Sequence, residues 1–298
     1  MIDISIVIIN YNTKDLTNSC IESIMKFTCD ISYEIILVDN ASADGSVQYF
    51  KDYQGISFFA MKENIGFGRA NNFGVDKASG KNIFLLNSDT LLIENSVKIL
   101  SDFHELNKLS MNIGVIGTKL TDEHGNIGNS GGKFPTVIRE IKEYAFIVLA
   151  KIFRRKTHCT DSYDFDQPII PIEYVSGANM FINRDLFLEV GGFDPAYFMY
   201  YEESDLQYRL TRNGYRNYLI TTTSIIHLEG ASTVRKGKNL IKRWIYQKSR
   251  NHFFKKNDKS FYPIYVLFDM LVNVTRLFNP AYSFRENISF IRKNISSY

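Results

Sequence analysis

The chain has 298 residues, 45% apolar and 14% aromatic, so it can bury the core of one large α/β domain or two smaller ones. Its net charge of +3 is unremarkable, and its three cysteines lack C-x-x-C spacing, which argues against a disulfide scaffold or a zinc site. The first ten residues carry no basic segment, and no window of about 20 residues is apolar enough to span a bilayer. We therefore expect a cytoplasmic chain without signal peptide or membrane span.

The N-terminal third predicts strands and helices in alternation. Short apolar runs typical of strands covered on both faces are followed by segments whose apolar residues have helical spacing. The predicted strands cover residues 4–9, 33–38, 56–61 and 83–86; the predicted helices cover 15–27 and 69–78, with another opening at 43–46. This order favours a doubly wound sheet.

The pattern continues less regularly toward the C-terminus. We expect helices at 94–106 and 202–213, strands at 113–120, 173–183, 215–220 and 224–227, and a hairpin turn at 122–126. Residues 131–171 are interpreted as a variable excursion. The predicted domains are a catalytic domain at 1–232, with a nucleotide-binding half to about 120 and an acceptor-binding half beyond it, and a basic, amphipathic helical region at 233–298.

Polar loops follow three of the predicted strands. They begin at Asn10, Asp39 and Asn87, and the last carries a carboxylate at Asp89. Ligands of open α/β sheets bind at the carboxyl ends of strands, so these loops predict a nucleotide-sized ligand across one sheet edge. The alternative for each loop is an ordinary turn, with Asp89 as a helix cap.

A cluster of carboxylates opens the predicted helix at 202–213. Glu202 and Glu203 follow the aromatic run at 197–201, which would half bury a carboxylate and raise its pKa toward the range of a general base. The alternative is a charged helix start, in which Asp205 pairs with Arg209.

His227 closes a short apolar strand, a position where a histidine is often structural. Together with Asp89 it would instead complete a mixed oxygen and nitrogen site suited to Mn²⁺ or Mg²⁺.

A glycine-rich loop lies at residues 64–72. It does not match the P-loop, and position 71 is Asn, so the dinucleotide-binding fingerprint is incomplete. The loop nevertheless opens a helix with Arg69 near its start, where phosphate binds readily.

Seven short motifs, in chain order, resemble those of family 2 glycosyltransferases, and the pattern is similar to the bacterial rhamnosyltransferase-like branch that builds surface polysaccharides. They lie at residues 5–12, 38–42, 64–72, 86–90, 191–194, 202–205 and 227. The resemblance covers about residues 4–232. It implies a GT-A fold, that is, a Rossmann-like doubly wound mixed sheet, here with a helical C-terminal extension, and inverting, metal-dependent transfer from a nucleotide-diphosphate sugar.

The resemblance also assigns roles by position. Nucleotide-binding positions, with Asp39 as the nucleobase contact, are Asn10, Tyr11, Asn12, Asp39, Asn64, Gly66, Arg69, Asn87 and Ser88. Asp89 and His227 match the metal positions, and Glu203 falls at the catalytic base, with Glu202 as the neighbouring candidate. We expect acceptor contacts from Gly177, Ala178 and Asp205.

Two positions depart from the family pattern. The first carboxylate of the D-x-D motif is Asn87, which removes one charge from the metal site. The base position holds glutamate instead of aspartate, so the choice between Glu202 and Glu203 stays open.

The C-terminal region joins a basic stretch to an apolar one. Residues 235–259 contain ten Lys or Arg and one acid, interleaved with aromatic residues, and carry no nucleic-acid recognition motif. On a helix, Ile264, Tyr265, Leu271 and Val272 would share one broad face with Phe261 and Phe268. This pattern favours peripheral binding to an anionic membrane, namely the inner face of a bacterial plasma membrane. The alternative is packing against the catalytic domain or the partner of a homodimer.

These expectations define the function. The sequence predicts transfer of a sugar, with rhamnose as the candidate, from a dTDP- or UDP-linked donor to a polyprenyl-diphosphate-linked saccharide. A sugar-nucleotide pyrophosphorylase is an alternative, but it would carry a Gly-rich, Arg-containing loop after the first strand, where residues 10–13 read Asn-Tyr-Asn-Thr. The second alternative is a degenerate, non-catalytic protein that binds a sugar nucleotide.

Overall fold

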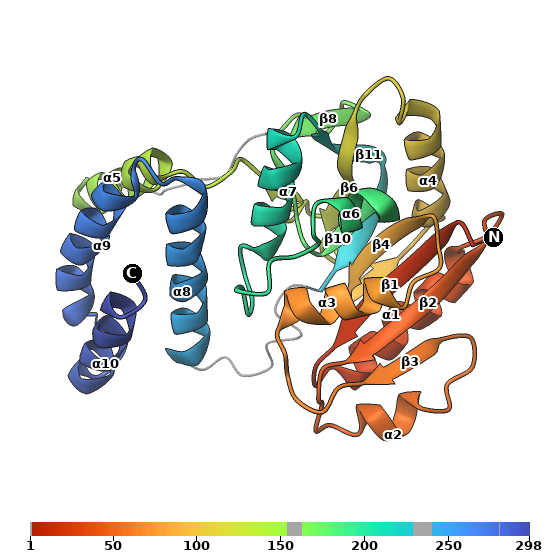
Figure 1. Cartoon of the computed structure of the whole chain (residues 1–298), viewed down its shortest axis with the longest axis horizontal. Coiled ribbons are helices and arrows are strands. Elements are labelled where there is room, and N and C mark those ends of the chain that lie inside the picture. Colours follow the sequence, from red (N-terminus) through yellow and green to blue (C-terminus); the bar gives the residue numbers. More distant parts are fainter. Residues whose placement is uncertain (1, 154–162, 229–239, 280) are drawn as a thin grey trace. The chain divides into compact units, whose positions relative to one another are not determined.

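A computed structural model describes residues 2–153, 163–228, 240–279 and 281–298. The chain forms two compact units, and each is described by itself (Figure 1). The first comprises Met1–Lys133, Tyr163–Pro195 and Glu202–Val234, and the second comprises Phe134–Ser162, Ala196–Tyr201 and Arg235–Tyr298. The predicted domain boundary at 232 lies outside the described residues. Two segments before it, 134–162 and 196–201, group with the C-terminal helices.

The first unit is a mixed sheet with helices on both faces (Figure 1). Its elements are β1 (Ile4–Asn10), α1 (Lys14–Phe27), β2 (Tyr33–Asp39), α2 (Ser46–Phe50), β3 (Ser57–Ala60), α3 (Phe67–Asp76), β4 (Asn82–Asn87), β5 (Thr90–Leu92), α4 (Ser96–Asn107), β6 (Ile113–Thr121), β7 (Gly131–Gly132), β8 (Ile169–Ile172), β9 (Tyr174–Val175), β10 (Asn179–Asn183), α6 (Arg184–Glu189), α7 (Glu202–Arg212) and β11 (Arg216–His227). The main sheet has the order β3-β2-β1-β4-β10-β6-β11-β5, with β8 paired to β11. β1 runs parallel to β2 and β4, whereas β10 is antiparallel to β4 and β6. The predicted doubly wound mixed sheet is confirmed.

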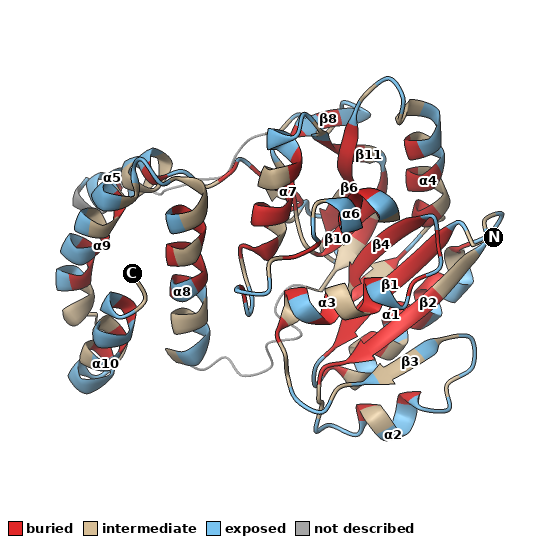
Figure 2. Cartoon of the chain, in the orientation of Figure 1, coloured by how far each residue is buried: buried red, intermediate tan, exposed pale blue. Residues whose placement is uncertain are grey.

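The apolar runs form central strands because both faces of the sheet are covered. Along β1, Ile6 and Ile8 pack into the core that α1 covers, and Val7 packs into the core that α3 and α7 cover. All seven residues of β1 are buried. Figure 2 shows this buried centre in β1, β2 and β4. Because successive side chains of a strand point to opposite faces, a strand between two helix layers needs an unbroken apolar run.

Several elements differ from the prediction. The strand expected at 173–183 is two strands, β9 and β10, with a turn between them in which the Asn179 N–H donates to the Ser176 carbonyl. The strands expected at 215–220 and 224–227 are one strand, β11, with an irregularity between Ile220 and Ser224. β5, β7, β8 and α6 are additional. These elements are two to six residues long, too short for periodicity to reveal.

The second unit is helical. It contains α5 (Val137–Ile152), α8 (Leu240–Asn257), α9 (Tyr262–Leu277) and α10 (Phe284–Ile295). α5 lies inside the segment interpreted as a variable excursion. Its core combines aromatic residues with a buried ion pair between Arg250 and Asp269. Within the described ranges, no helix is long and apolar enough to cross a bilayer.

The apolar face predicted for α9 is partly buried and partly exposed. Tyr265 and Val272 are buried, but Ile264 and Leu271, expected on the same face, are 50% and 70% exposed. The six residues that the sequence places on one face of this helix therefore lie partly on its buried side and partly on its exposed side. α9 packs against α5, α8 and α10 on one side only, and its other side keeps an exposed apolar stripe, Ile264, Leu267, Leu271, Val274 and Phe278.

Candidate active site

The carboxyl ends of three central strands meet at one edge of the sheet. The register places Asn10 of β1 opposite Asp39 of β2, and Ile9 opposite Asn87 of β4. Three of the loops that the sequence singles out therefore lie on neighbouring strands, where the ligands of open α/β sheets bind.

Asn10 holds this edge together. Its Nδ2 donates to Asp39 Oδ2 at 2.6 Å and to Ser42 Oγ at 3.1 Å, and the hydroxyls of Thr13 and Thr17 donate to its Oδ1 at 2.8 Å. Asn10 and Asp39 are both fully buried. Since buried polar groups must be satisfied, these contacts fix the loops in place. The nucleobase contact of Asp39 stays a prediction, and it would require an oxygen already bonded to Asn10 Nδ2 or to the Ser42 N–H to accept a second hydrogen.

Tyr11 and Asn12 form the turn after β1. Asn12 has a left-handed φ of 56°, which asparagine tolerates, and its Oδ1 accepts a 2.7 Å hydrogen bond from the Ala43 N–H. Tyr11 remains 48% exposed. The turn thus joins the loops of β1 and β2 and leaves an aromatic ring open for stacking on a base.

The loop after β4 delivers Ser88 and Asp89. Ser88 Oγ lies 3.1 Å from Thr13 Oγ1, which ties this loop to the β1 edge. Thr90 opens β5, where it pairs with His227 at the end of β11, and the Leu228 N–H donates to the Asp89 carbonyl at 2.9 Å.

This pairing brings the two predicted metal ligands together. Asp89 Oδ1 lies 3.3 Å from His227 Nε2, and both side chains are largely buried. Two adjacent ligands on an octahedral ion with bonds of about 2.1 Å are about 3 Å apart, so the pair fits one divalent cation. Within the described part of the chain, no group of three or more His, Cys, Asp or Glu side chains could hold a metal ion. Other ligands would have to come from a bound diphosphate, water or Asn87.

The turn between β9 and β10 connects this loop to the acidic start of α7. The Asn87 N–H donates to the Ala178 carbonyl at 3.0 Å. A side chain at Gly177 would begin 3.6 Å from Glu203 Cβ, so Gly177 lies directly beside Glu203. Gly177 and Ala178 thus lie between the N-S-D loop and the predicted base.

The two glutamates at the start of α7 occupy an environment that disfavours charge. Burial, reinforced by the charge of Glu203, raises the pKa of Glu202 well above its usual value, and burial also raises the pKa of Glu203. Glu202 Oε2 is buried without a hydrogen-bond partner. The expected direction of the pKa shift is confirmed. Such a carboxyl group, once ionised, is a better proton acceptor than an exposed one.

Two tyrosines before Glu202 have unusual backbone conformations. Tyr200 and Tyr201 have φ values of 72° and 69°, a region that bulky residues rarely adopt. Left-handed conformations of this kind cost about 1–2 kcal/mol each and gather near functional segments.

The glycine-rich loop approaches the same glutamates. A side chain at Gly68 would begin 3.1 Å from Phe193 Cβ and 3.5 Å from Glu202 Cβ. Glycine therefore lets α3 pack closely against this segment. Asn64 Oδ1 accepts hydrogen bonds at 3.0 Å from Asn40 Nδ2 and from the N–H of Gly66, whose φ is 90°.

Arg69 and Asp205 are engaged within the protein. Arg69 Nε donates to the Pro195 carbonyl at 2.8 Å, although the residue is exposed. Asp205 is fully buried and pairs with Arg209 at 2.9 Å, as expected for an i,i+4 pair. These contacts support structural roles, and the nucleotide contact of Arg69 and the acceptor contact of Asp205 stay predictions.

A cavity of about 570 Å³ opens beside His227. Its other lining residues come from the end of β6 and the turn that follows it, and from Leu228. The sequence predicts the turn at 122–126 but not its position beside His227.

Sequence reasoning missed Thr13, Thr17 and Ser42 as supports of the site. Hydroxyl side chains in loops are common, so only the register of β1 against β2 reveals that these bind Asn10. Thr13 follows the Asn-Tyr-Asn turn directly, and that position is the only sequence signal that could have identified it.

Comparisons with known proteins show what the chain is similar to. Residues 5–191 match the model of a family described as "Glycosyl transferase family 2". An N-acetylglucosaminyl-diphospho-decaprenol L-rhamnosyltransferase of Mycobacterium tuberculosis is 26% identical over 215 residues, 67% of this chain and 68% of the relative. The rhamnosyltransferase WbbL of Escherichia coli is 24% identical over 74% of this chain and 82% of the relative, and the low-salt glycan biosynthesis hexosyltransferase Agl10 of Haloferax volcanii is 22% identical over 86% and 76%.

Among solved structures, the chain is similar to GalNAc-T7, which was crystallised with UDP, GalNAc and Mn²⁺. The TM-score is 0.61 at 17% identity, and the match covers 99% of this chain and 55% of that chain. At this identity the similarity shows the fold alone, and the fold is GT-A.

Proposed function

The chain belongs to glycosyl transferase family 2, within its rhamnosyltransferase-like branch, and from that premise we propose that it transfers a sugar from a nucleotide-diphosphate donor to a saccharide acceptor with inversion of configuration. One observation carries the proposal. Asp89 Oδ1 and His227 Nε2 lie 3.3 Å apart where polar strand ends meet, and Gly177 and Ala178 link this loop to Glu203.

The donor would lie along the edge formed by β1, β2 and β4. The nucleoside would contact Tyr11, Asn12 and Asp39, and the glycine-rich loop from Asn64 to Arg69 would close its other side. Rhamnose is the first candidate for the sugar, since the relatives from M. tuberculosis and E. coli are named rhamnosyltransferases. The proposed donor is its dTDP- or UDP-linked form.

Asp89 and His227 would hold Mn²⁺ or Mg²⁺ beside the donor's diphosphate. Such an ion, when bound, stabilises the negative charge that develops on the leaving diphosphate. Asp89 supplies the charge, and His227 a neutral nitrogen ligand. Asn87 contributes an amide where the family has a second carboxylate, which lowers the negative charge that faces the cation.

Glu203 would act as the general base. In a single displacement the acceptor hydroxyl attacks the anomeric carbon from the face opposite the diphosphate, and Glu203 takes the hydroxyl proton. The reaction needs one base and no covalent enzyme intermediate. The turn at Gly177 and Ala178 presents no large side chain beside Glu203. A polyprenyl-diphosphate-linked saccharide is the proposed acceptor, since the M. tuberculosis relative is named for an N-acetylglucosaminyl-diphospho-decaprenol.

A thermal-shift screen of nucleotide-diphosphate sugars tests donor binding. We expect dTDP- or UDP-linked sugars to stabilise the protein in the presence of Mn²⁺ or Mg²⁺ and to have little effect in EDTA. A ligand at a hundred times its Kd contributes about 2.7 kcal/mol to stability, which corresponds to a rise in Tm of several degrees.

An assay with an N-acetylglucosaminyl-diphospho-polyprenol completes this test. Release of nucleoside diphosphate with growth of the saccharide supports the proposal. Formation of nucleoside triphosphate from added pyrophosphate would instead indicate a pyrophosphorylase, and binding without any turnover would indicate a non-catalytic protein.

We further propose that the helical unit binds the inner face of a bacterial plasma membrane peripherally. The exposed stripe of α9 supplies apolar side chains that are 50% to 73% exposed. α8 contributes exposed lysines at 242, 248 and 255. Apolar side chains that enter the headgroup region and cations that attract anionic lipids act together in such binding.

Vesicle co-sedimentation checks membrane binding. The wild type is expected to bind phosphatidylglycerol vesicles at low salt, and the double variant Leu267→Glu/Leu271→Glu to bind at least about tenfold more weakly, because two exposed apolar contacts become charged. Leu109→Glu is the matched control, since Leu109 is 93% exposed on the first unit. Equal binding by both variants would contradict the proposal. A wild-type dimer that the double variant disrupts, without vesicle binding, would assign the stripe to a second copy of the chain.

A further inference from the structure

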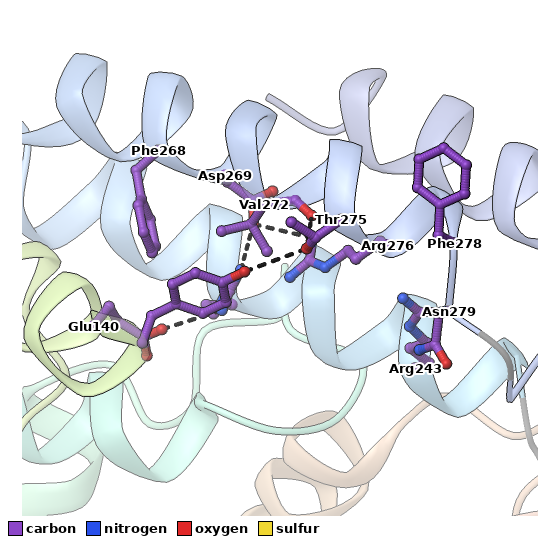
Figure 3. A pocket seen from close by; sticks show the side chains of 11 residues that line it. Glu140, Arg243, Phe268, Asp269, Val272, Thr275, Arg276, Phe278 and Asn279 are labelled. Carbon is purple, nitrogen blue, oxygen red and sulfur yellow. Dashed lines mark hydrogen bonds and ion pairs between the residues drawn. The ribbon is translucent and has the colours of Figure 1, made fainter. Parts of the chain in front are cut away.

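The helical unit contains a polar cavity that the proposed reaction does not use. It has a volume of about 510 Å³ (Figure 3). Its walls come from α5, α8, α9 and the segment after α9. The lining residues that matter for the argument are Glu140, Arg243, Arg250, Asp269, Thr275 and Arg276.

Two of the three arginines are neutralised within the unit. Arg250 pairs with Glu140 at 3.1 Å and with Asp269 at 2.6 Å, and Arg276 pairs with Asp269 at 3.0 Å. Asp269 is fully buried and accepts both pairs. Burial raises the pKa of Glu140, and the Arg250 charge and hydrogen bond act in the opposite direction and favour the ionised form. The two carboxylates are therefore committed to Arg250 and Arg276.

Arg243 is the remaining cation. Its Nη1 is buried without a hydrogen-bond partner, and within the described ranges no carboxylate pairs with it. Its guanidinium is held against Phe290 and Tyr282, 3.8 Å and 5.0 Å from the two ring centroids. Burial and the nearby charge of Arg276 lower its pKa, yet an arginine stays protonated in a protein. In Figure 3 no dashed line reaches Arg243, whereas Glu140 and Asp269 are both bonded.

We infer that this cavity binds the phosphate group of a long-chain lipid, with Arg243 as the anchoring residue. A guanidinium presents paired N–H groups that match phosphate oxygens, and an unpaired one in a cavity lacks the anion that would offset its desolvation. Asn279 and the Thr275 hydroxyl add polar groups to the same wall.

The apolar surroundings define the rest of the ligand. Phe278 lines the cavity and is 73% exposed, and Val274, 61% exposed, belongs to the same α9 stripe. A hydrocarbon chain attached to a phosphate in the cavity could therefore lie along α9. Two sources share this chemistry, an isoprenoid diphosphate such as the proposed acceptor carries, and a membrane phospholipid. The first source rests on the proposed function.

Binding measurements on the full chain, without donor or transfer, test the inference. The probes are farnesyl diphosphate, farnesol and phosphatidylglycerol vesicles. Arg243→Gln is expected to weaken binding of the phosphorylated probe about tenfold or more, the loss typical of a hydrogen bond to a charged group, and to leave farnesol binding unchanged. Arg243→Lys should restore much of the affinity. Arg285→Gln removes an exposed charge of the same unit outside the cavity and should have no effect.

A second variant keeps the test informative if Arg243→Gln unfolds. Thr275→Glu places a carboxylate at an exposed position of the cavity wall and should weaken the same probe. Weaker farnesyl diphosphate binding with unchanged vesicle binding identifies the isoprenoid diphosphate, and weaker vesicle binding identifies a phospholipid headgroup. If folded variants bind all probes as the wild type does, the inference is wrong, whether or not the protein transfers a sugar.

Discussion

Replacement of Glu203 by glutamine is expected to reduce sugar transfer by about 10²–10⁴-fold while nucleotide binding stays within about twofold of the wild type. Glutamine keeps the size of the side chain and loses its basicity. Glu203 faces Gly177, which has no side chain, and Gly177 adjoins Ala178, which accepts a hydrogen bond from Asn87. Of the two adjacent glutamates, Glu203 is the one that lies beside this turn.

The pH dependence of the wild-type reaction should also show that Glu203 acts as the base. Burial raises the pKa of Glu203, and a general base must be ionised to accept a proton. As the pH falls, kcat/KM should therefore decline through a value above the ordinary glutamate pKa of about 4.3. The residual activity of Glu203→Gln should lack this acidic limb.

Glu202→Gln is the control for this prediction. Glu202 is 4% exposed and its Oε2 has no hydrogen-bond partner, so it is the less accessible carboxyl group. We expect its glutamine variant to retain transfer within about tenfold. Steady-state kinetics and nucleotide titration of both variants decide the assignment. Loss of transfer in Glu202→Gln with near-normal turnover in Glu203→Gln would assign the base to Glu202.

Removal of the metal pair is the second change with a large expected effect. EDTA or Asp89→Asn should lower transfer by at least about 10²-fold, because the charge on the leaving diphosphate loses its electrostatic stabilisation. Asp89 Oδ1 lies 3.3 Å from His227 Nε2, so His227→Ala should produce a loss of the same kind. Metal titrations of activity provide the measurement. Asp102→Asn removes an exposed carboxylate from α4 and should have no effect.

Asn87 offers a gain-of-function version of the same test. Asn87→Asp adds the carboxylate that the family carries at this position, and it should lower the Mn²⁺ concentration needed for half-maximal activity, since carboxylates are preferred ligands of hard cations. Full activity in excess EDTA would exclude the proposed metal pair. An unchanged Mn²⁺ requirement in Asn87→Asp would exclude position 87 from the metal site.

The sequence predicted β1, β2 and β4, whose carboxyl ends form the proposed nucleotide-binding edge. Each of these strands is visible in its own residues, without knowledge of its neighbours. β1, β2 and β4 are covered on both faces, so each must be an unbroken apolar run, and the run ends where polar loops begin. The placement of Asp89 and the carboxylate cluster of α7 followed from motifs at characteristic positions. These needed no knowledge of which strands are neighbours.

Features that depend on long-range pairing were not predictable. The contact of Asp89 with His227 was expected from the metal positions of the family, but the strand pairing that produces it was not, because β5 has only three residues and its pairing with β11 leaves no local pattern. The division of the predicted strand at 173–183 into β9 and β10 was also not predictable. The turn at Ser176 interrupts a run that looks continuous, because its carbonyl accepts from the Asn179 N–H.

The helical unit shows the same limit. Spacing alone placed Tyr265 and Leu271 of α9 on one face, but the direction of the core is set by α5, α8 and α10 together. The ion pairs of Asp269 with Arg250 and Arg276 lie on the buried side, and the pattern of a single helix does not reveal them.

One assay tests the central claim most directly. Wild type, Glu203→Gln and Asp89→Asn are incubated with a dTDP- or UDP-linked sugar, Mn²⁺ and a polyprenyl-diphosphate-linked saccharide, and release of nucleoside diphosphate is measured. The account predicts acceptor-dependent release by the wild type and a loss of at least about 10²-fold in both variants. Equal release by all three proteins would contradict it.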